Sequence, residues 1–422
     1  MDSLTRSRIT IVLIANTLLR VAGSSGGILI AFYLASTAST SGMSDVAIIG
    51  VLGIILNVAE LIGAVPVGLA TDRFSARSVL VAGALLGGLA TLMYFLSQAV
   101  AVFFVARAIQ GVVAVVGGPP LLALITEATK NSPLARNRVI GFYELSLLSG
   151  LALGGLVGGT LWDRFGVVAF SLLSVFYLVI AALFWWGAQI PNRMKSEHPL
   201  EGLRHALANP TLLKLAPAWL ALNAVIGLWL THIAFQLKGP KIDGQVLNGR
   251  FSATEVGYIL LVYAILFASG VLGWTFMLGR VTRVQTMRIS IFALLGTCAG
   301  LYALNAYVWP PAIEWLIVGV TSISVLISSG FTPAALAYLA SLADEGEGRG
   351  STMGVYTLLL GLGNAIGAGI GGVLASGMGF NGLIVGTLGL VVLALLAVTQ
   401  LPEHVGSTQV LTPDSLPLTA DH

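Results

Sequence analysis

Twelve long apolar runs constrain the fold of this chain more than any other feature. A helix needs roughly 20 residues to cross about 30 Å of hydrocarbon, and these runs are long and lack the alternation of strands. Charged residues make up only 9% of the chain, against about 25% in soluble domains, so most of the surface must face lipid. The runs span residues 9–36, 45–70, 78–97, 100–127, 138–161, 167–188, 212–237, 254–278, 287–305, 312–340, 351–377 and 380–401. The sequence therefore predicts an all-α membrane protein with twelve transmembrane helices.

The placement of basic residues predicts the orientation in the membrane. With the N-terminus in the cytoplasm, 15 of the 21 Lys and Arg residues fall in cytoplasmic segments and only 4 in external ones. Short cytoplasmic loops carry an excess of Lys and Arg. We therefore expect both termini in the cytoplasm, with the chain crossing the plasma or inner membrane many times.

An internal repeat divides the chain into two halves. Shifted by 213 residues, the segment 141–161 aligns without a gap on 354–374, and 10 of the 21 paired positions are identical. Duplicated halves with a site between them are a transporter architecture. We expect two pseudo-twofold-related six-helix bundles and a central site lined by the first, fourth, seventh and tenth spans. The predicted divisions are a first bundle 1–190, a cytoplasmic linker 191–211, a second bundle 212–401 and a cytoplasmic tail 402–422.

Three short motifs carry a resemblance to a known family. They are GLATDRFSARSVL between the second and third spans, VARAIQG in the fourth, and SGLALGGLVGG in the fifth. Together they resemble the signatures of the major facilitator superfamily of secondary transporters, and the third resembles that of its drug:proton antiporters. The chain departs from these patterns at Ser75, where the family usually has Gly, at Ala76, where it usually has a base, and at Gly155, where it usually has proline.

The resemblance implies a cytoplasmic latch at the turn between the second and third spans. In the family such a network holds the two halves together when the outside is open. A carboxylate here would also face the start of the eleventh span, because a helix N-terminus attracts negative charge. The alternative is a solvated turn that only enforces topology. The candidate latch residues are Asp72, Arg73, Arg77 and Glu127.

Ionisable and amide side chains within the spans are candidates for a substrate or proton site, because such groups are costly in a membrane. At 1.5 Å per residue, Arg20 lies about 18 Å into the first span and Glu60 about 22 Å into the second, so both are near mid-depth. They form a plausible buried pair, either functional or structural. The resemblance favours a role for Arg107 in handling protons or substrate. Glu144 could instead reach the inner interface, and His232 could be merely hydrogen-bonded. The full set is Arg20, Asn57, Glu60, Arg107, Gln110, Glu144, Asn223 and His232.

Glycine rows in the fifth and eleventh spans predict close helix contacts. Glycine at i and i+4 lets another backbone approach closely. We expect these rows to lie at the seam between the halves; tight packing within one half is the alternative. The glycines are Gly150, Gly154, Gly158, Gly363, Gly367 and Gly371.

No residue pattern indicates an enzyme. The chain has no His/Cys spacing typical of a metal site, and its Gly-rich motifs lie in membrane helices instead of after a soluble strand. We expect no cofactor, no metal and no nucleic-acid partner, and a monomer that binds a small molecule and a proton or other coupling ion within the lipid bilayer. The favoured function is proton-coupled efflux of small organic molecules by alternating access. Alternatives are a solute uptake permease, with an anionic solute in view of Arg20 and Arg107, and a transport-inactive membrane sensor.

Overall fold

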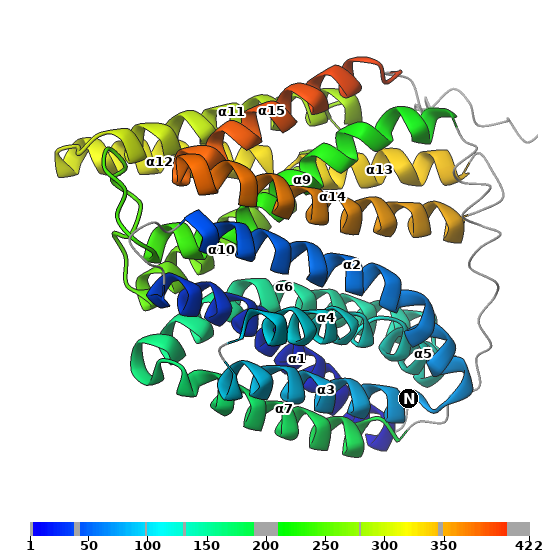
Figure 1. Ribbon diagram of the computed structural model, residues 1–422. Coiled ribbons are helices and arrows are strands. Elements are labelled where there is room, and N and C mark those ends of the chain that lie inside the picture. Colours follow the sequence, from blue (N-terminus) through cyan, green and yellow to red (C-terminus); the bar gives the residue numbers. More distant parts are fainter. Residues whose placement is uncertain are drawn as a thin grey trace, which may run out of the picture.

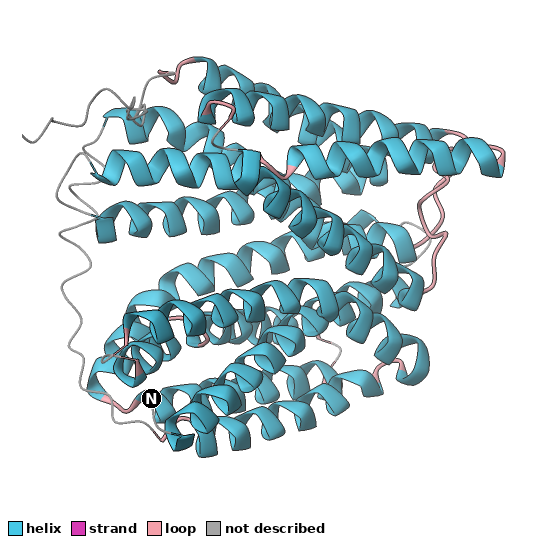
Figure 2. Ribbon diagram, turned by 180° about the vertical axis from the view of Figure 1, so that it is seen from behind, coloured by secondary structure: helices cyan, strands magenta, loops and turns pink. Residues whose placement is uncertain are grey.

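The computed structural model describes residues 3–37, 43–97, 99–129, 132–189, 210–277, 280–344 and 349–402. Within these ranges every regular element is an α-helix (Figure 2). The first half contains α1 (Ser3–Thr37), α2 (Met43–Arg73), α3 (Ala76–Leu96), α4 (Val100–Val116), α5 (Pro119–Ala128), α6 (Pro133–Phe165) and α7 (Val168–Gly187). The second half contains α9 (Pro210–Lys238), α10 (Ala253–Met277), α11 (Arg283–Ala306), α12 (Pro311–Ser328), α13 (Phe331–Asp344), α14 (Arg349–Met378) and α15 (Phe380–Thr399).

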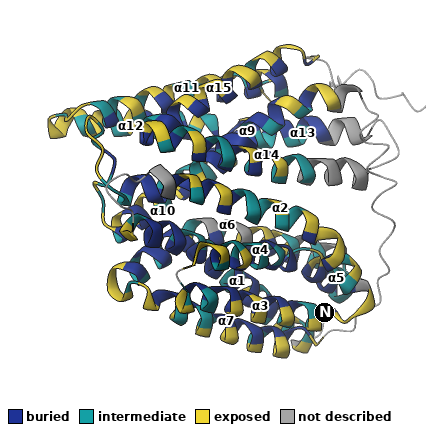
Figure 3. Cartoon of the chain, in the orientation of Figure 1, coloured by how far each residue is buried: buried dark blue, intermediate teal, exposed yellow. Residues whose placement is uncertain are grey.

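The described chain has eleven segments that are helical, long and apolar enough to cross a membrane. The remaining expected span, 138–161, lies inside α6, a helix of 33 residues. Exposed residues follow the outer sides of the helices (Figure 3). Many of them are large and apolar; on α7, for example, Trp185 and Trp186 are 54% and 64% exposed. An apolar surface of this extent, on helices of membrane-spanning length, is typical of a protein that faces lipid. The prediction of an all-α protein with twelve spans is therefore confirmed.

Two of the expected spans are each broken into two helices. The run 100–127 is split at Gly117 and Gly118 between α4 and α5, and the run 312–340 is split at Ser329 and Gly330 between α12 and α13. Pro119 follows the first break, and proline cannot donate the backbone hydrogen bond that would continue the helix. Each pair of helices still forms one candidate membrane span, Val100–Ala128 and Pro311–Leu339, so the number of spans is unchanged.

The two halves repeat the same packing. In the first half α1 packs against α6 and α7, and in the second half α9 packs against α14 and α15 in the same way. The tight turns after α6 and α14 each contain a left-handed glycine, Gly166 with φ +52° and Gly379 with φ +57°. These glycines are 213 residues apart, as the repeat requires. The halves meet along two helix pairs, α2 with α14 and α6 with α10 (Figure 1). The pseudo-twofold axis that relates the two halves converts one pair into the other.

The bundle has two distinguishable ends. The start of α1 and the turn between α2 and α3 lie at one end, which we name the terminal face (Figure 1). The connection 239–252 between α9 and α10 lies at the other, which we name the loop face (Figure 1). Residues 190–209 and 403–422 lie outside the described residues. These ranges contain most of the expected linker, 191–211, and most of the expected tail, 402–422. The boundary between the two bundles therefore stays a prediction.

Candidate functional site

A cavity of about 310 Å³ lies between the two halves. Its walls come from α1, α2, α4 and α7 of the first half and from α9, α10 and α14 of the second. The first, fourth and seventh spans therefore line it as expected, whereas no described residue of the tenth span does. The polar and charged side chains on the walls are Arg20, Ser24, Asn57, Arg107, Gln110, Tyr177, Thr231, Tyr263 and Asn364.

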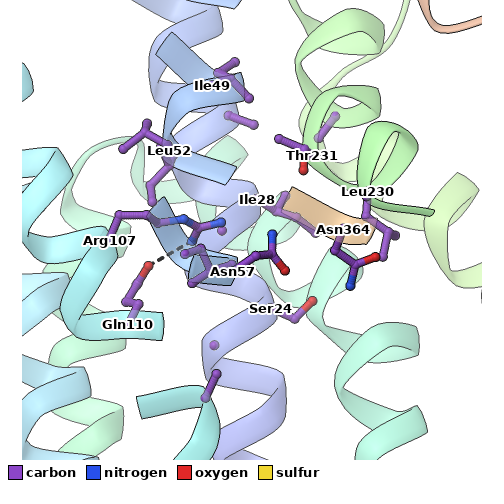
Figure 4. A pocket seen from close by; sticks show the side chains of 18 of the residues that line it. Ser24, Ile28, Ile49, Leu52, Asn57, Arg107, Gln110, Leu230, Thr231 and Asn364 are labelled. Atoms are coloured by element: carbon purple, nitrogen blue, oxygen red, sulfur yellow. Dashed lines mark hydrogen bonds between the residues drawn. The ribbon is translucent and has the colours of Figure 1, made fainter. Parts of the chain in front are cut away.

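Arg107 and Gln110 form a polar cluster on the α4 wall. They stand one helical turn apart, so their side chains share one face of the helix. Nη1 of Arg107 donates to Oε1 of Gln110 at 2.9 Å (Figure 4). The hydroxyl of Tyr94 donates to the same oxygen at 3.2 Å. Nε of Arg107 has no hydrogen-bond partner although it is buried. The charge of Arg107 is thus held in the cavity wall by a neutral amide.

Arg20 reaches α4 from α1 at the same cavity. Its Nη1 donates to the backbone carbonyl of Ala114 at 3.1 Å. Glu60 lies within electrostatic reach of Arg20, but no hydrogen bond or ion pair of 4 Å or less joins these two described side chains, and Glu60 does not line the cavity. The expected pair therefore exists as a charge interaction without direct contact.

The structure places three candidate residues away from the cavity. His232 is completely buried between α9 and α14, where Nε2 lies 2.9 Å from the carbonyl oxygen of Ala368. Asn223 is buried and donates to the carbonyl of Trp219, one turn back on its own helix. Glu144 has an exposed side chain on α6. Of the eight candidates, the cavity therefore brings together Arg20, Asn57, Arg107 and Gln110.

Five polar residues of the cavity wall were not among the candidates: Ser24, Tyr177, Thr231, Tyr263 and Asn364. Asn364 borders the cavity from α14, opposite the first-half residue Asn57 (Figure 4). An amide inside the Gly-rich eleventh span was a signal that could have found it. Tyr177 lines the cavity from α7, and nothing in the sequence distinguishes this tyrosine from the others that pack.

At the expected latch, Arg77 contacts an aromatic ring of its own half. Its guanidinium carbon lies 3.6 Å from the ring centroid of Trp185 on α7. Arg73 ends α2 and is exposed. The Asp72 side chain lies outside the described set, and Glu127 is in α5, half-buried. The four residues thus lie at the terminal face, as the sequence placed them.

The six glycines expected at the seam pack within one half instead. A Cβ on Gly154 would overlap Ser24 of α1, and one on Gly367 would lie 2.7 Å from the carbonyl carbon of Ala224 of α9. Gly150 and Gly158 also face α1, and Gly363 and Gly371 also face α9. The expected seam position is therefore wrong and packing within one half is correct, because the i, i+4 row is the side of each helix that turns toward its own bundle.

The neighbouring glycines form the seams between the halves. A Cβ on Gly155 would lie 3.0 Å from Leu260 of α10, and one on Gly372 would lie 3.1 Å from Gly50 of α2. Near the loop face, Asp163 of α6 caps α10: its carboxylate accepts hydrogen bonds from the backbone N–H groups of Ala253 (3.3 Å) and Thr254 (2.7 Å). Helix N-termini attract such a charge. The two halves are therefore joined by polar as well as packing contacts.

No group of three or more His, Cys, Asp or Glu side chains in the described residues could hold a metal ion. What remains is a set of membrane-length helices in two related halves, with a polar cavity between them. This arrangement defines a multi-span membrane transporter.

Comparison with known proteins identifies the family. The model of the Major Facilitator Superfamily matches residues 12–318 and 243–417, so the chain belongs to that superfamily. It is 24% identical to the inner membrane transport protein YajR of Escherichia coli K12 over 386 residues, which cover 88% of this chain and 79% of that protein. It is 22% identical to multidrug resistance protein 1 of Bacillus subtilis 168, covering 75% of this chain and 78% of that protein.

Solved structures share the fold at low sequence identity. The nucleoside transporter NupG superposes with a TM-score of 0.76 at 16% identity, covering 94% of this chain and 99% of that one. A bacterial homologue of the human lysosomal transporter Spinster, inward-facing and occupied, superposes with a TM-score of 0.74 at 15% identity, covering 94% and 96%. The predicted superfamily and its two-bundle fold are confirmed.

Proposed function

We propose that this protein is a proton-coupled efflux antiporter for small organic molecules that works by alternating access. The observation that carries the proposal is the cavity, whose walls come from both halves. A relative motion of the halves would change which end of the cavity is open. The similarity to multidrug resistance protein 1 and the glycine signature of the fifth span support efflux as the direction.

The proposed orientation puts the terminal face, with both chain termini, in the cytoplasm. Close glycine contacts at Gly50, Gly372 and Gly159 bring the halves together toward the loop face, and the α2 and α14 ribbons diverge toward the terminal face (Figure 1). The structure would then be the conformation that is closed to the outside.

The latch would form in the opposite conformation. Here Arg77 rests on Trp185 of its own half, which is the position expected of a latch that is not engaged. In the state open to the outside, Asp72 would face the N-terminus of α14, with Arg73, Arg77 and Glu127 completing the network. Asp72→Asn would then weaken that state and lower transport.

Coupling to protons needs a carboxylate that substrate binding can influence. Glu60 is the proposed group, because it lies within electrostatic reach of Arg20, which lines the cavity. A substrate that draws on the charge of Arg20 would change the proton affinity of Glu60. The functional unit is proposed to be one chain, since a single chain supplies both cavity walls.

The test is dye accumulation in cells that express the protein. Expressing cells should accumulate less ethidium or less carboxyfluorescein than control cells, and a protonophore should abolish the difference. Glu60→Gln should remove the dependence on the proton gradient. Equal accumulation of both dyes with and without the protein would contradict efflux.

A second function, uptake of an anionic solute, is favoured by one observation: the two charged residues among the described part of the cavity wall, Arg20 and Arg107, are both arginines. Expressing cells would then accumulate more carboxyfluorescein than control cells, which is the opposite sign in the same assay.

A further inference from the structure

The cavity wall has an unusual charge balance. Of the described residues that line it, Arg20 and Arg107 are charged, and none is Asp, Glu, Lys or His. A charge removed from water is costly unless an opposite charge pairs with it. We propose that the cavity binds amphipathic organic anions, with a carboxylate of the ligand paired to Arg107.

The two arginines differ in how far other protein groups already balance their positive charge. Arg20 donates to the Ala114 carbonyl and feels the charge of Glu60. Arg107 donates to the neutral amide of Gln110, and no carboxylate of the described residues forms an ion pair with it. Its guanidinium is therefore the cationic group that a ligand must neutralise.

The position of Arg107 suits a ligand that enters between the halves. Its guanidinium points from α4 toward α2 and Asn57, and Asn364 borders the same space from α14 of the other half (Figure 4). The planar donor fork of an arginine matches a carboxylate in two parallel hydrogen bonds. The two amides, one from each half, would then contact polar groups elsewhere on the ligand.

The rest of the wall requires an apolar body on the anion. Most of the remaining lining side chains are aliphatic, including Ile28, Ile49, Leu52, Leu56 and Leu230. The volume of about 310 Å³ is at the small end of the range for ligand pockets, about 300–1,000 Å³. An inorganic anion would leave these side chains without contacts, so the ligand class is a small carboxylate with an aromatic or aliphatic portion.

The test is a binding measurement on the purified full-length protein in lipid nanodiscs at pH 7.5. Three probes of one carbon skeleton are compared by calorimetry: 4-phenylbutanoate, 4-phenylbutanamide and 4-phenylbutylamine. The carboxylate should bind about tenfold more tightly than the amide, since a hydrogen-bonded charge pair contributes about that much. The amine should bind most weakly.

Variants then assign the preference to Arg107. Arg107→Gln should lower carboxylate affinity about tenfold and leave amide affinity unchanged, and Arg107→Lys should retain part of the preference, since it keeps the charge without the fork. Arg250→Gln is the matched control, because Arg250 pairs with Glu314 outside the cavity. Equal affinity for the three probes, tightest binding of the amine, or no carboxylate binding by the wild type would overturn the inference, as would a carboxylate preference that survives Arg107→Gln.

This inference rests on the proposed transport function only for the steps after binding. A carboxylate preference in a protein that moves neither dye would support the inference and contradict transport. Efflux of ethidium by a protein that shows no carboxylate preference would support transport and contradict the inference.

Discussion

At the residue scale, two glycines of α14 offer a matched test of helix packing. A Cβ on Gly367 would press into the Ala224 backbone of α9, whereas one on Gly377 would meet nothing within 4 Å. Gly367→Ala should therefore lower the free energy of unfolding by about 1–3 kcal/mol, the usual cost of overpacking. Gly377→Ala should raise it slightly, because alanine is the better helix former. Urea unfolding in detergent, followed by tryptophan fluorescence, measures both.

The contact between Arg77 and Trp185 is a second residue-scale test. Trp185→Leu should cost about 0.5–1 kcal/mol of stability, as expected for a cation–π contact near the surface. Trp186→Leu is the control, since the neighbouring tryptophan is also exposed and makes no such contact in the described structure. A double-mutant cycle with Arg77→Gln isolates the pair. A coupling energy of zero would show that the two side chains pack without a specific interaction.

The sequence predicts how deep a residue lies in the membrane better than which way it points. Counting helical rise placed Arg20 near mid-depth, and it lines the cavity. The same count cannot give the rotation of a helix about its axis, so His232 was a candidate although it faces Ala368 inside its own half. Asn364 lies among the α14 glycines that pack against α9, and a Cβ on Gly227 of α9 would meet its backbone. The spacing of these residues therefore does not show that its side chain borders the cavity.

At the element scale, the polar contact between α6 and α10 holds the halves together near the loop face. The equivalent residue of α14, 213 positions after Asp163, is Ser376, and its hydroxyl donates to Val373 of its own helix. The carboxylate is therefore an addition to one seam, not a requirement of the repeat. Ser252 and Glu255 satisfy further donors of the same α10 end, so Asp163 supplies the part of the cap that crosses between halves.

Removal of this cap should loosen the loop face. Loss of a capping side chain costs about 1 kcal/mol, so Asp163→Ala should raise the population of the state open at that end about fivefold. The measurement uses a Cys298→Ser background with Leu260→Cys on the cavity wall. A membrane-impermeant maleimide is added from the loop-face side, and the rate at which it labels the cysteine at position 260 should be higher in Asp163→Ala. Asp163→Asn should fall between, because it keeps an oxygen acceptor but loses the charge.

The control for this experiment is Asp243→Ala, an exposed acid in the 239–252 connection. It removes the same charge from the same face without touching the seam. If it accelerates labelling as much as Asp163→Ala does, the effect is one of general surface charge and the cap does not hold the halves together.

The elements themselves were largely predictable, while their contacts were less so. Long apolar runs gave the spans, and the 213-residue repeat gave the relation between α6 and α14. The breaks at Gly118 and Gly330 were not predicted, although Gly118-Pro119 and Ser329-Gly330 are turn signals. The glycine rows predicted close approach correctly but assigned it to the wrong neighbour: each helix has two glycine faces, and spacing alone does not say which one meets the other half.

At the scale of the whole molecule, the two seams are the surfaces that alternating access must separate. They are related by the internal twofold, but Asp163 strengthens only one of them. Among the described residues that line the cavity, the charged ones all lie on the first half. The second half contributes neutral groups such as Thr231 and Asn364. A rocking motion would therefore carry an anion that stays on Arg107 while the second half changes position around it.

A disulfide across the α2–α14 seam should stop this motion. A Cβ on Gly369 would lie 3.8 Å from Cγ1 of Ile54, so a cysteine sulfur at the γ position of residue 54 would lie within reach of one at residue 369. In a Cys298→Ser background, Ile54→Cys with Gly369→Cys should cross-link on mild oxidation and abolish the difference in dye accumulation, and reduction should restore it. Ile54→Cys with Gly377→Cys is the control, because Gly377 has no neighbour within 4 Å and should neither cross-link nor respond to oxidation. Full activity of the cross-linked protein would show that this seam stays closed throughout transport, and that the halves do not rock about the cavity.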